Sequence, residues 1–168
     1  MNIELILFGA FALLTLLSAG MVIFARSPIN SAMALVSTFF FLAGLYVLLW
    51  AHTVAVMQVL VYAGAIMVLF LFVIMLLNLG ESPTRGRPTL ARLAGGAATV
   101  GLLAVLAITL LKLPEGSSAM GPEAQASFGT MATMGEVIFT QWLFPFEAVS
   151  LLLLVAMVGA VVVAKSRI

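Results

Sequence analysis

The sequence contains no cysteine and a single histidine, His52. Without cysteine the chain can form no disulfide bond, no thiolate-held iron–sulfur cluster and no cysteine-type zinc site. A lone histidine likewise excludes paired imidazole ligation of haem or of a metal ion within the chain. Any redox cofactor that works with this protein is therefore expected on a partner.

Charged residues are also scarce. They make up 8% of the 168 residues, and 64% of the residues are hydrophobic, whereas about 25% charged residues are usual in a soluble domain. So few charges cannot cover the surface of a soluble fold, and the excess apolar surface is expected to face lipid or neighbouring membrane helices. A formal net charge of +1 gives no indication of a nucleic-acid partner. The length fits one membrane domain, residues 1–168.

Long apolar stretches predict an all-α integral membrane protein of about five transmembrane helices, because about 20 apolar residues cross about 30 Å of hydrocarbon. Residues 27–80 hold no Asp, Glu, Lys or Arg; as one helix they would reach roughly 80 Å, so they must fold back. The expected turn follows Trp50, with Thr53 as the helix cap. The predicted helices span approximately 3–25, 29–50, 54–79, 90–111 and 143–165. Loops are expected at 80–89 and 112–142, the latter with a short interfacial helix in its second half.

The basic residues predict the orientation of these helices. Basic residues concentrate in the cytoplasmic loops of membrane proteins. With five spans, one side carries only Lys112, and the other carries six basic residues: Arg26, Arg85, Arg87, Arg92, Lys165 and Arg167. We therefore expect the amino terminus and loop 112–142 outside, and loop 80–89 and the carboxyl terminus in the cytoplasm.

The third predicted helix carries an unusual polar spot. Gln58 and Tyr62 are four residues apart, which places them on one face of an α-helix. Tyr62 would lie about 12 Å below the helix start, too deep for the interfacial aromatic belt, so its hydroxyl would need a partner or a water. Beside it, residues 63–65 form a small-residue patch around Gly64 where another backbone can approach. From the residues alone, the pattern is more typical of a tyrosine buried in a helix seam with Gly64 as its contact.

Glu147 is the other candidate. It follows Pro145, and proline and glutamate are both favoured in the first turn of a helix, glutamate because of the positive end of the helix dipole. A capping role is thus the ordinary interpretation, and a proton relay is the alternative. No hydrolase motif, phosphate-binding glycine loop or metal-ligand cluster accompanies these residues.

Two segments carry a resemblance to a known family. Residues 58–70 read QVLVYAGAIMVLF, and residues 146–160 read FEAVSLLLLVAMVGA. The first resembles the third-helix signature of the subunit J family of bacterial complex I, the proton-pumping NADH–quinone oxidoreductase. The second is similar to the fifth helix of that family, which also includes chain 10 and mitochondrial subunit 6. The remaining helices match in character only.

The resemblance implies a place for the chain in a larger enzyme. Family members hold no cofactor; FMN, iron–sulfur clusters and quinone belong to other subunits. They sit in the membrane arm beside subunits A, H and K, between the quinone site and the antiporter-like pumps. The location implied is the bacterial cytoplasmic membrane.

The resemblance also implies a mechanism. The third helix of the family carries a π-bulge beside the tyrosine that matches Tyr62, and switching between π and α geometry is held to gate a water path for protons. Gly64 makes such a bulge plausible. Some family members have a carboxylate at the position of Gln58, which cannot titrate and can only polarise or bridge water. The proton-path candidates are thus Tyr62, Gly64, Gln58 and Glu147.

Three alternatives stay open from the sequence. The chain could serve a multisubunit cation/proton antiporter or a membrane-bound hydrogenase of related architecture. It could be a stand-alone channel or transporter. It could also be a purely structural bundle within the same oxidoreductase.

Overall fold

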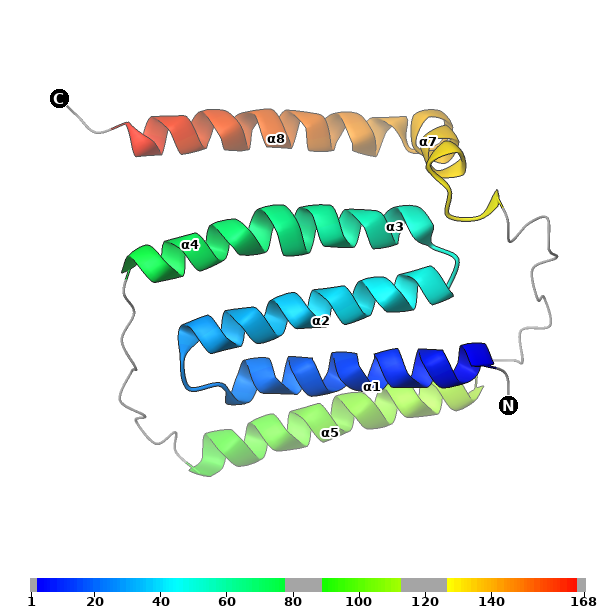
Figure 1. Ribbon diagram of the computed structural model, residues 1–168, viewed down its shortest axis with the longest axis vertical. Helices are drawn as coiled ribbons and strands as arrows, with labels where there is room; N and C mark the ends of the chain where they lie inside the picture. Colours follow the sequence, from blue (N-terminus) through cyan, green and yellow to red (C-terminus); the bar gives the residue numbers. More distant parts are fainter. Residues whose placement is uncertain (1–2, 78–88, 113–126, 166–168) are drawn as a thin grey trace.

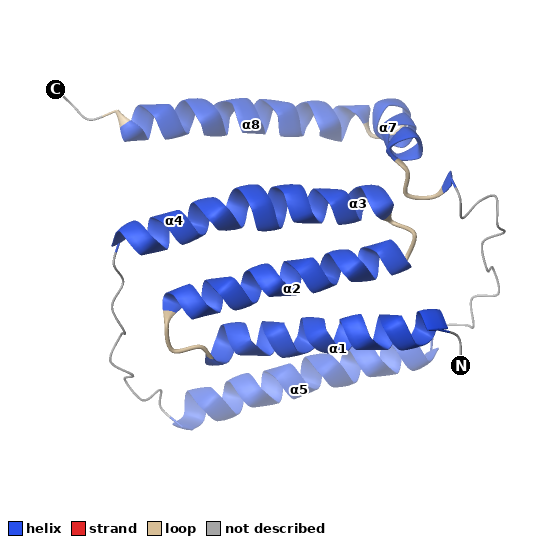
Figure 2. Ribbon diagram, in the orientation of Figure 1, coloured by secondary structure: helices blue, strands red, loops and turns tan. Residues whose placement is uncertain are grey.

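The computed structural model describes residues 3–77, 89–112 and 127–165, and every regular element in these ranges is a helix (Figure 1, Figure 2). The loop residues 80–88 and 113–126, with Arg85 and Arg87, lie outside the described residues, as does Arg167. The helices are α1 (Ile3–Phe24), α2 (Pro28–Leu48), α3 (His52–Met57), η1 (Gln58–Ile66), α4 (Met67–Leu77), α5 (Thr89–Lys112), α7 (Met131–Thr140) and α8 (Leu143–Ala164).

The elements α3, η1 and α4 follow one another without a break and form one span, His52–Leu77, of 26 residues. This span, α1, α2 and α8 are each long and apolar enough to cross a membrane. The 24 residues of α5 rise about 36 Å, enough for a hydrocarbon layer of about 30 Å. The prediction of an all-α membrane protein of about five helices is confirmed. The start of α1 and the end of α8 lie at opposite ends of the array (Figure 1), as an odd number of spans requires.

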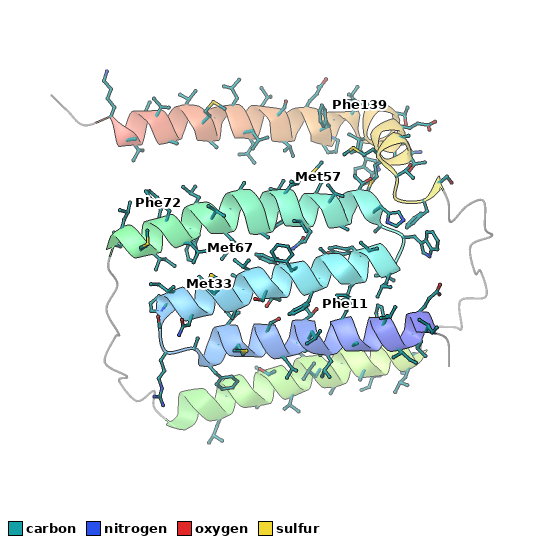
Figure 3. The ribbon with its side chains drawn as sticks, in the orientation of Figure 1. Phe11, Met33, Met57, Met67, Phe72 and Phe139 are labelled. Carbon is teal, nitrogen blue, oxygen red and sulfur yellow. The ribbon has the colours of Figure 1, made fainter. Side chains whose placement is uncertain are left out.

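Helices α1 and α2 approach closely because Gly44 has no side chain. A Cβ built on Gly44 would lie 2.6 Å from Cε1 of Phe11, and Figure 3 shows Phe11 between the two helices. Two hydroxyl groups add contacts across this seam: Thr38 donates to Oγ of Ser18 at 3.0 Å, and Ser31 donates to the carbonyl of Val22 at 2.7 Å. Small residues and hydroxyl bonds of this kind hold membrane helices together, since apolar side chains gain little over lipid.

The contact between α2 and α4 is wholly apolar. Ala32 of α2 and Met67 and Ile74 of α4 form a buried cluster, with Leu35, Val36, Phe39 and Leu71 packed around it. Met67 lies between the two helices in Figure 3. This cluster holds the second half of the third span against α2.

Helices α5 and α8 have no buried residue among those whose side chains are described. α8 makes its main contact with α7, where the rings of Phe139 and Phe146 meet edge to face with centroids 5.1 Å apart. Over the described residues only six apolar side chains are buried. Most of the apolar surface is therefore left for lipid or for other membrane subunits.

The turn between α2 and α3 differs from the prediction. α2 ends in a Schellman motif, in which Ala51 N–H donates to Tyr46 at 2.9 Å and Trp50 N–H donates to Val47 at 3.1 Å. Trp50 takes the left-handed position with φ 61°, which glycine usually occupies. This compact turn lets the third span begin at His52 instead of residue 54.

Thr53 is not the helix cap, so that prediction was wrong. The N-cap is Ala51, without a side-chain cap bond, and Thr53 lies in the first turn of α3. Its backbone N–H and its hydroxyl both donate to the carbonyl of Gly129, at 3.0 and 2.7 Å. The Thr53 hydroxyl therefore bonds the distant Gly129 carbonyl and does not cap its own helix. The short helix expected in the second half of loop 112–142 is present as α7.

Candidate functional site

The first half of the third span contains a nine-residue π-helix, Gln58–Ile66. The N–H of Met67 donates to the carbonyl of Tyr62, five residues earlier, as π geometry requires. A Cβ built on Gly64 would lie 3.2 Å from the carbonyl oxygen of Val59, again five residues earlier. Glycine therefore relieves crowding inside the wide turn. The π geometry implied by the family resemblance is confirmed, and such turns are frequent at functional sites.

The buried face of the span steps by five residues at this point. Its buried residues are Ala55, Gln58, Ala63, Met67 and Ile74. An α-helix would return to the face of Gln58 at about residue 62, yet Ala63 is 5% exposed and Tyr62 is 49% exposed. The π turn thus places a small alanine on the buried face and turns the tyrosine outward.

The expectation that Gln58 and Tyr62 share one face was therefore wrong, because the wide turn holds an additional residue. Gln58 is 6% exposed, and its amide forms no hydrogen bond to any described residue. The ring of Tyr62 rests against Phe39 of α2, with centroids 5.7 Å apart and planes tilted by 54°. The Tyr62 hydroxyl has no hydrogen-bond partner among the described residues, and it is not buried within this chain.

Gly64 also differs from its expected surroundings. It is exposed, and the atom nearest to a Cβ built there belongs to its own helix. The interpretation of Gly64 as the contact of a seam with another helix of this chain was wrong. Ala63 takes that place, and Gly64 serves the geometry of the π turn.

Glu147 lies apart from these residues. α8 begins at Leu143 and has no acidic residue in its first turn, so Glu147 is one turn further in than the capping interpretation required. Its backbone carbonyl accepts a hydrogen bond from the hydroxyl of Ser150 at 2.6 Å. The carboxylate side chain is exposed. The fold of this chain brings Gln58, Ala63 and Tyr62 together on one short segment, and it leaves Glu147 outside that group.

The arrangement offers polar groups for water but no ligand set for a metal ion. Over the described residues no group of three or more His, Cys, Asp or Glu side chains could hold a metal. The amide of Gln58 can both donate and accept a hydrogen bond, and so can the hydroxyl of Tyr62. Each of these two groups can bind water, Gln58 from the buried face of the span and Tyr62 from its exposed side.

The sequence did not indicate the roles of three residues: Ala63 on the buried face, and Thr53 and Gly129 as partners in a long-range hydrogen bond. Ala63 was missed because the pattern was analysed with an α-helical period. The pair Gly129-Thr130 before an apolar helix is a start signal for α7, and Thr130 does accept a bond from the N–H of Thr133 at 3.4 Å. That signal locates α7 and gives no indication of its contact with Thr53.

Comparisons with known proteins cover nearly the whole chain. The sequence model of the family "NADH-ubiquinone/plastoquinone oxidoreductase chain 6" matches residues 18–163. The chain is 42% identical over 159 residues to NADH-quinone oxidoreductase subunit 10 of Thermus thermophilus, covering 91% of this chain and 85% of the relative. It is 33% identical over 164 residues to subunit J of the same enzyme from Rhodobacter capsulatus, covering 96% and 81%.

A third relative works with a different named electron donor. F(420)H(2) dehydrogenase subunit J of Methanosarcina mazei is 35% identical over 167 residues, covering 98% of this chain and 93% of the relative. Together, the membrane-spanning helices, the π turn at Gln58–Ile66 and a family match from 18 to 163 show that this chain belongs to the NADH-ubiquinone/plastoquinone oxidoreductase chain 6 family and is a membrane subunit of that proton-translocating enzyme complex.

Proposed function

We propose that the third span of this subunit is a conformational gate that couples quinone reduction to proton translocation. The observation that carries the proposal is the five-residue step between Gln58 and Ala63, both buried, which leaves Tyr62 49% exposed. A change from π to α geometry would restore the four-residue step and exchange Tyr62 for Ala63 on the buried face. A methyl group and a phenol ring would thus alternate at one point of the seam with α2.

The size of the change follows from helix geometry. Taking one residue out of the turn rotates the following helix by about 100° and shifts it by about 1.5 Å. Two such backbone states need to differ by only a few kcal/mol to act as a switch. Phe39 of α2 already contacts the Tyr62 ring. The Tyr62 ring can therefore stay in contact with Phe39 while it moves toward the buried face.

Gln58 supports a water path at the same place. The residue is 6% exposed, and no fully buried side-chain nitrogen or oxygen among the described residues lacks a hydrogen-bond partner, so the unbonded Gln58 amide keeps access for water or for a partner subunit. Gln58 has no protein partner among the described residues and carries no ionisable group. It orients water, and Tyr62 opens or closes the path as the helix changes register. Glu147 is a secondary candidate, because it is exposed on α8 and has no described contact with this segment.

The finer assignments are part of the same proposal. The chain forms one membrane domain, residues 1–168, in the bacterial cytoplasmic membrane. It packs against subunits A, H and K and the antiporter-like subunits, and FMN, iron–sulfur clusters and quinone lie elsewhere in the complex. Helices α5 and α8 support this, because all of their described side chains are exposed, and apolar helices that their own chain leaves uncovered require lipid or partner helices.

Co-purification separates this assignment from related complexes. The M. mazei relative, an F(420)H(2) dehydrogenase subunit, shows that proteins of this type serve more than one electron donor. Flavin and iron–sulfur subunits recovered with the chain would support the NADH–quinone enzyme. Nickel–iron subunits would indicate a hydrogenase, and recovery of neither would indicate a transporter.

Deletion of one residue tests the gate directly. Removing the exposed Leu60 gives a four-residue step from Gln58 to Ala63, so both halves of the span keep their buried faces in a continuous α-helix. We expect the complex to assemble on a native gel. NADH–quinone turnover and pumping should each fall roughly tenfold or more, equivalent to about 1.4 kcal/mol per tenfold in rate. Normal turnover and pumping in an assembled deletion complex would exclude the gate.

A further inference from the structure

The α2–α3 end of the third span is tied to the segment that precedes α7. Thr53 donates twice to one acceptor, the Gly129 carbonyl: through its N–H at 3.0 Å and through its hydroxyl at 2.7 Å. The donor and acceptor residues are 76 positions apart. This is the contact that joins the beginning of the span to the α7 segment by backbone and side-chain hydrogen bonds together.

The acceptor is held rigidly. Gly129 is buried, and its φ of 67° is a left-handed conformation that favours glycine. A Cβ at this position would meet the carbonyl oxygen of Trp50 and lie 2.8 Å from the Cα of Ala51. The backbone of the segment thus lies directly on the Schellman turn. On its other side, Thr130 caps α7.

The other end of the span has no such bond. Every residue of α4, Met67–Leu77, is apolar, and its contact with α2 is the apolar cluster around Ala32. Turning α4 about its axis would exchange one apolar face for another. Among the described residues, this rotation would bury no new polar group and would break no side-chain hydrogen bond, so the energetic resistance to it is low compared with that at Thr53.

A register change in η1 rotates the two halves of the span relative to each other, and the better-anchored half stays in place. We propose that Thr53 is a positioning residue that fixes α3, so that the gate delivers its rotation of about 100° to α4. This inference rests on the proposed gate in η1 and adds its direction. The output of the switch then appears at the Met67–Leu77 end of the span.

Cross-linking in the assembled complex tests the direction, because this chain has no native cysteine. One pair, Ala43→Cys with Ala55→Cys, joins α2 to α3 at two buried positions that line the same cavity. The other pair, Ala32→Cys with Ile74→Cys, joins α2 to α4 within the apolar cluster. A short reducible bis-thiol cross-linker is applied, and closure is measured by loss of maleimide-tag labelling. The complex without added cysteines receives the same treatment as control.

We expect closure of the 32–74 pair to abolish most NADH-driven proton pumping and reduction of the linker to restore it. Closure of the 43–55 pair should leave pumping within about twofold of the untreated variant. A twofold change in rate corresponds to roughly 0.4 kcal/mol, because a tenfold change corresponds to about 1.4 kcal/mol. Inhibition by the 43–55 link, with or without inhibition by the other, would overturn the anchoring role of Thr53. Full activity with both links closed would show that the span does not rotate, and the proposed gate itself would fail.

A matched pair of variants tests Thr53 directly. Thr53→Val keeps the shape of the side chain and removes the hydroxyl, whereas Thr53→Ser keeps the hydroxyl. We expect Thr53→Val to lower the number of protons pumped per NADH oxidised, and Thr53→Ser to retain it, in complexes present in equal amounts on a native gel. A purely structural role would reduce the amount of complex without changing this ratio. Equal ratios in the two variants would contradict the proposal.

Discussion

Gln58 and Ala63 are five residues apart and lie on the same buried face of the third span, with 6% and 5% of their surfaces exposed. Tyr62, which an α-helical period would place there, is turned outward and leans on Phe39. The π turn therefore determines which side chain is buried, Ala63 or Tyr62.

Gly64→Val should disfavour the π turn. The new Cβ would lie 3.2 Å from the Val59 carbonyl oxygen, and overpacking of this kind costs about 1–3 kcal/mol. We expect NADH–quinone turnover and proton pumping to fall together while the complex still assembles on a native gel. Ala65→Val is the matched control, because Ala65 is the exposed neighbour. Equal activity of the two variants would show that Gly64 has no special role.

Tyr62→Phe should have a milder effect. The hydroxyl has no partner among the described residues, so its loss should leave the stability of the chain unchanged. If the hydroxyl bonds water or a partner subunit during turnover, its removal costs about 0.5–1.5 kcal/mol and slows pumping accordingly. Pumping rates of purified complexes measure this. An unchanged rate would remove the hydroxyl from the proton path and leave only the ring as the gate.

Glu147→Gln should be tolerated. The carboxylate is exposed on α8, beyond the first turn, where a helix-dipole interaction is worth at most about 0.3–1 kcal/mol. We expect pumping close to that of the unaltered complex, measured as acidification driven by NADH. Loss of most pumping in an assembled Glu147→Gln complex would favour the relay role over our assignment.

The membrane orientation can be tested with single cysteines. Ser27 lies in the α1–α2 turn and His52 at the start of α3, so they occupy opposite ends of α2. The six-to-one distribution of basic residues predicts that Ser27 faces the cytoplasm and His52 the outside. An impermeant thiol reagent applied to intact cells should label His52→Cys and spare Ser27→Cys. The reverse pattern would invert the topology.

Gly44→Ala should loosen the contact between α1 and α2. Its Cβ would lie 2.6 Å from the Phe11 ring, and we expect a loss of about 1–3 kcal/mol in stability, seen as a lower melting temperature of the complex. Gly20→Ala is the control, because its Cβ would meet nothing within 4 Å. Replacing the Phe11 ring with the smaller leucine side chain, in a Gly44→Ala/Phe11→Leu double variant, should restore stability. Failure of that rescue would show that the ring is not the obstacle.

Composition and residue order by themselves determined the class of this protein. With 8% charged residues and 64% hydrophobic residues, the chain has no way to form a soluble surface, and the length of each apolar run determines the number of helices. The segment at 58–70 also carries enough family-specific detail to indicate the π turn. These properties depend on local sequence, and the structure agrees with them.

Tertiary structure decided which residues meet. The choice of Ala63 over Tyr62 for the buried face depends on the π register, which no α-helical pattern contains. The bond from Thr53 to Gly129 joins residues 76 positions apart, and it replaces a local cap that the sequence favours. For Thr53 the decisive interaction is with a distant segment, and its free energy, which outweighs the local preference, is absent from any short window of sequence.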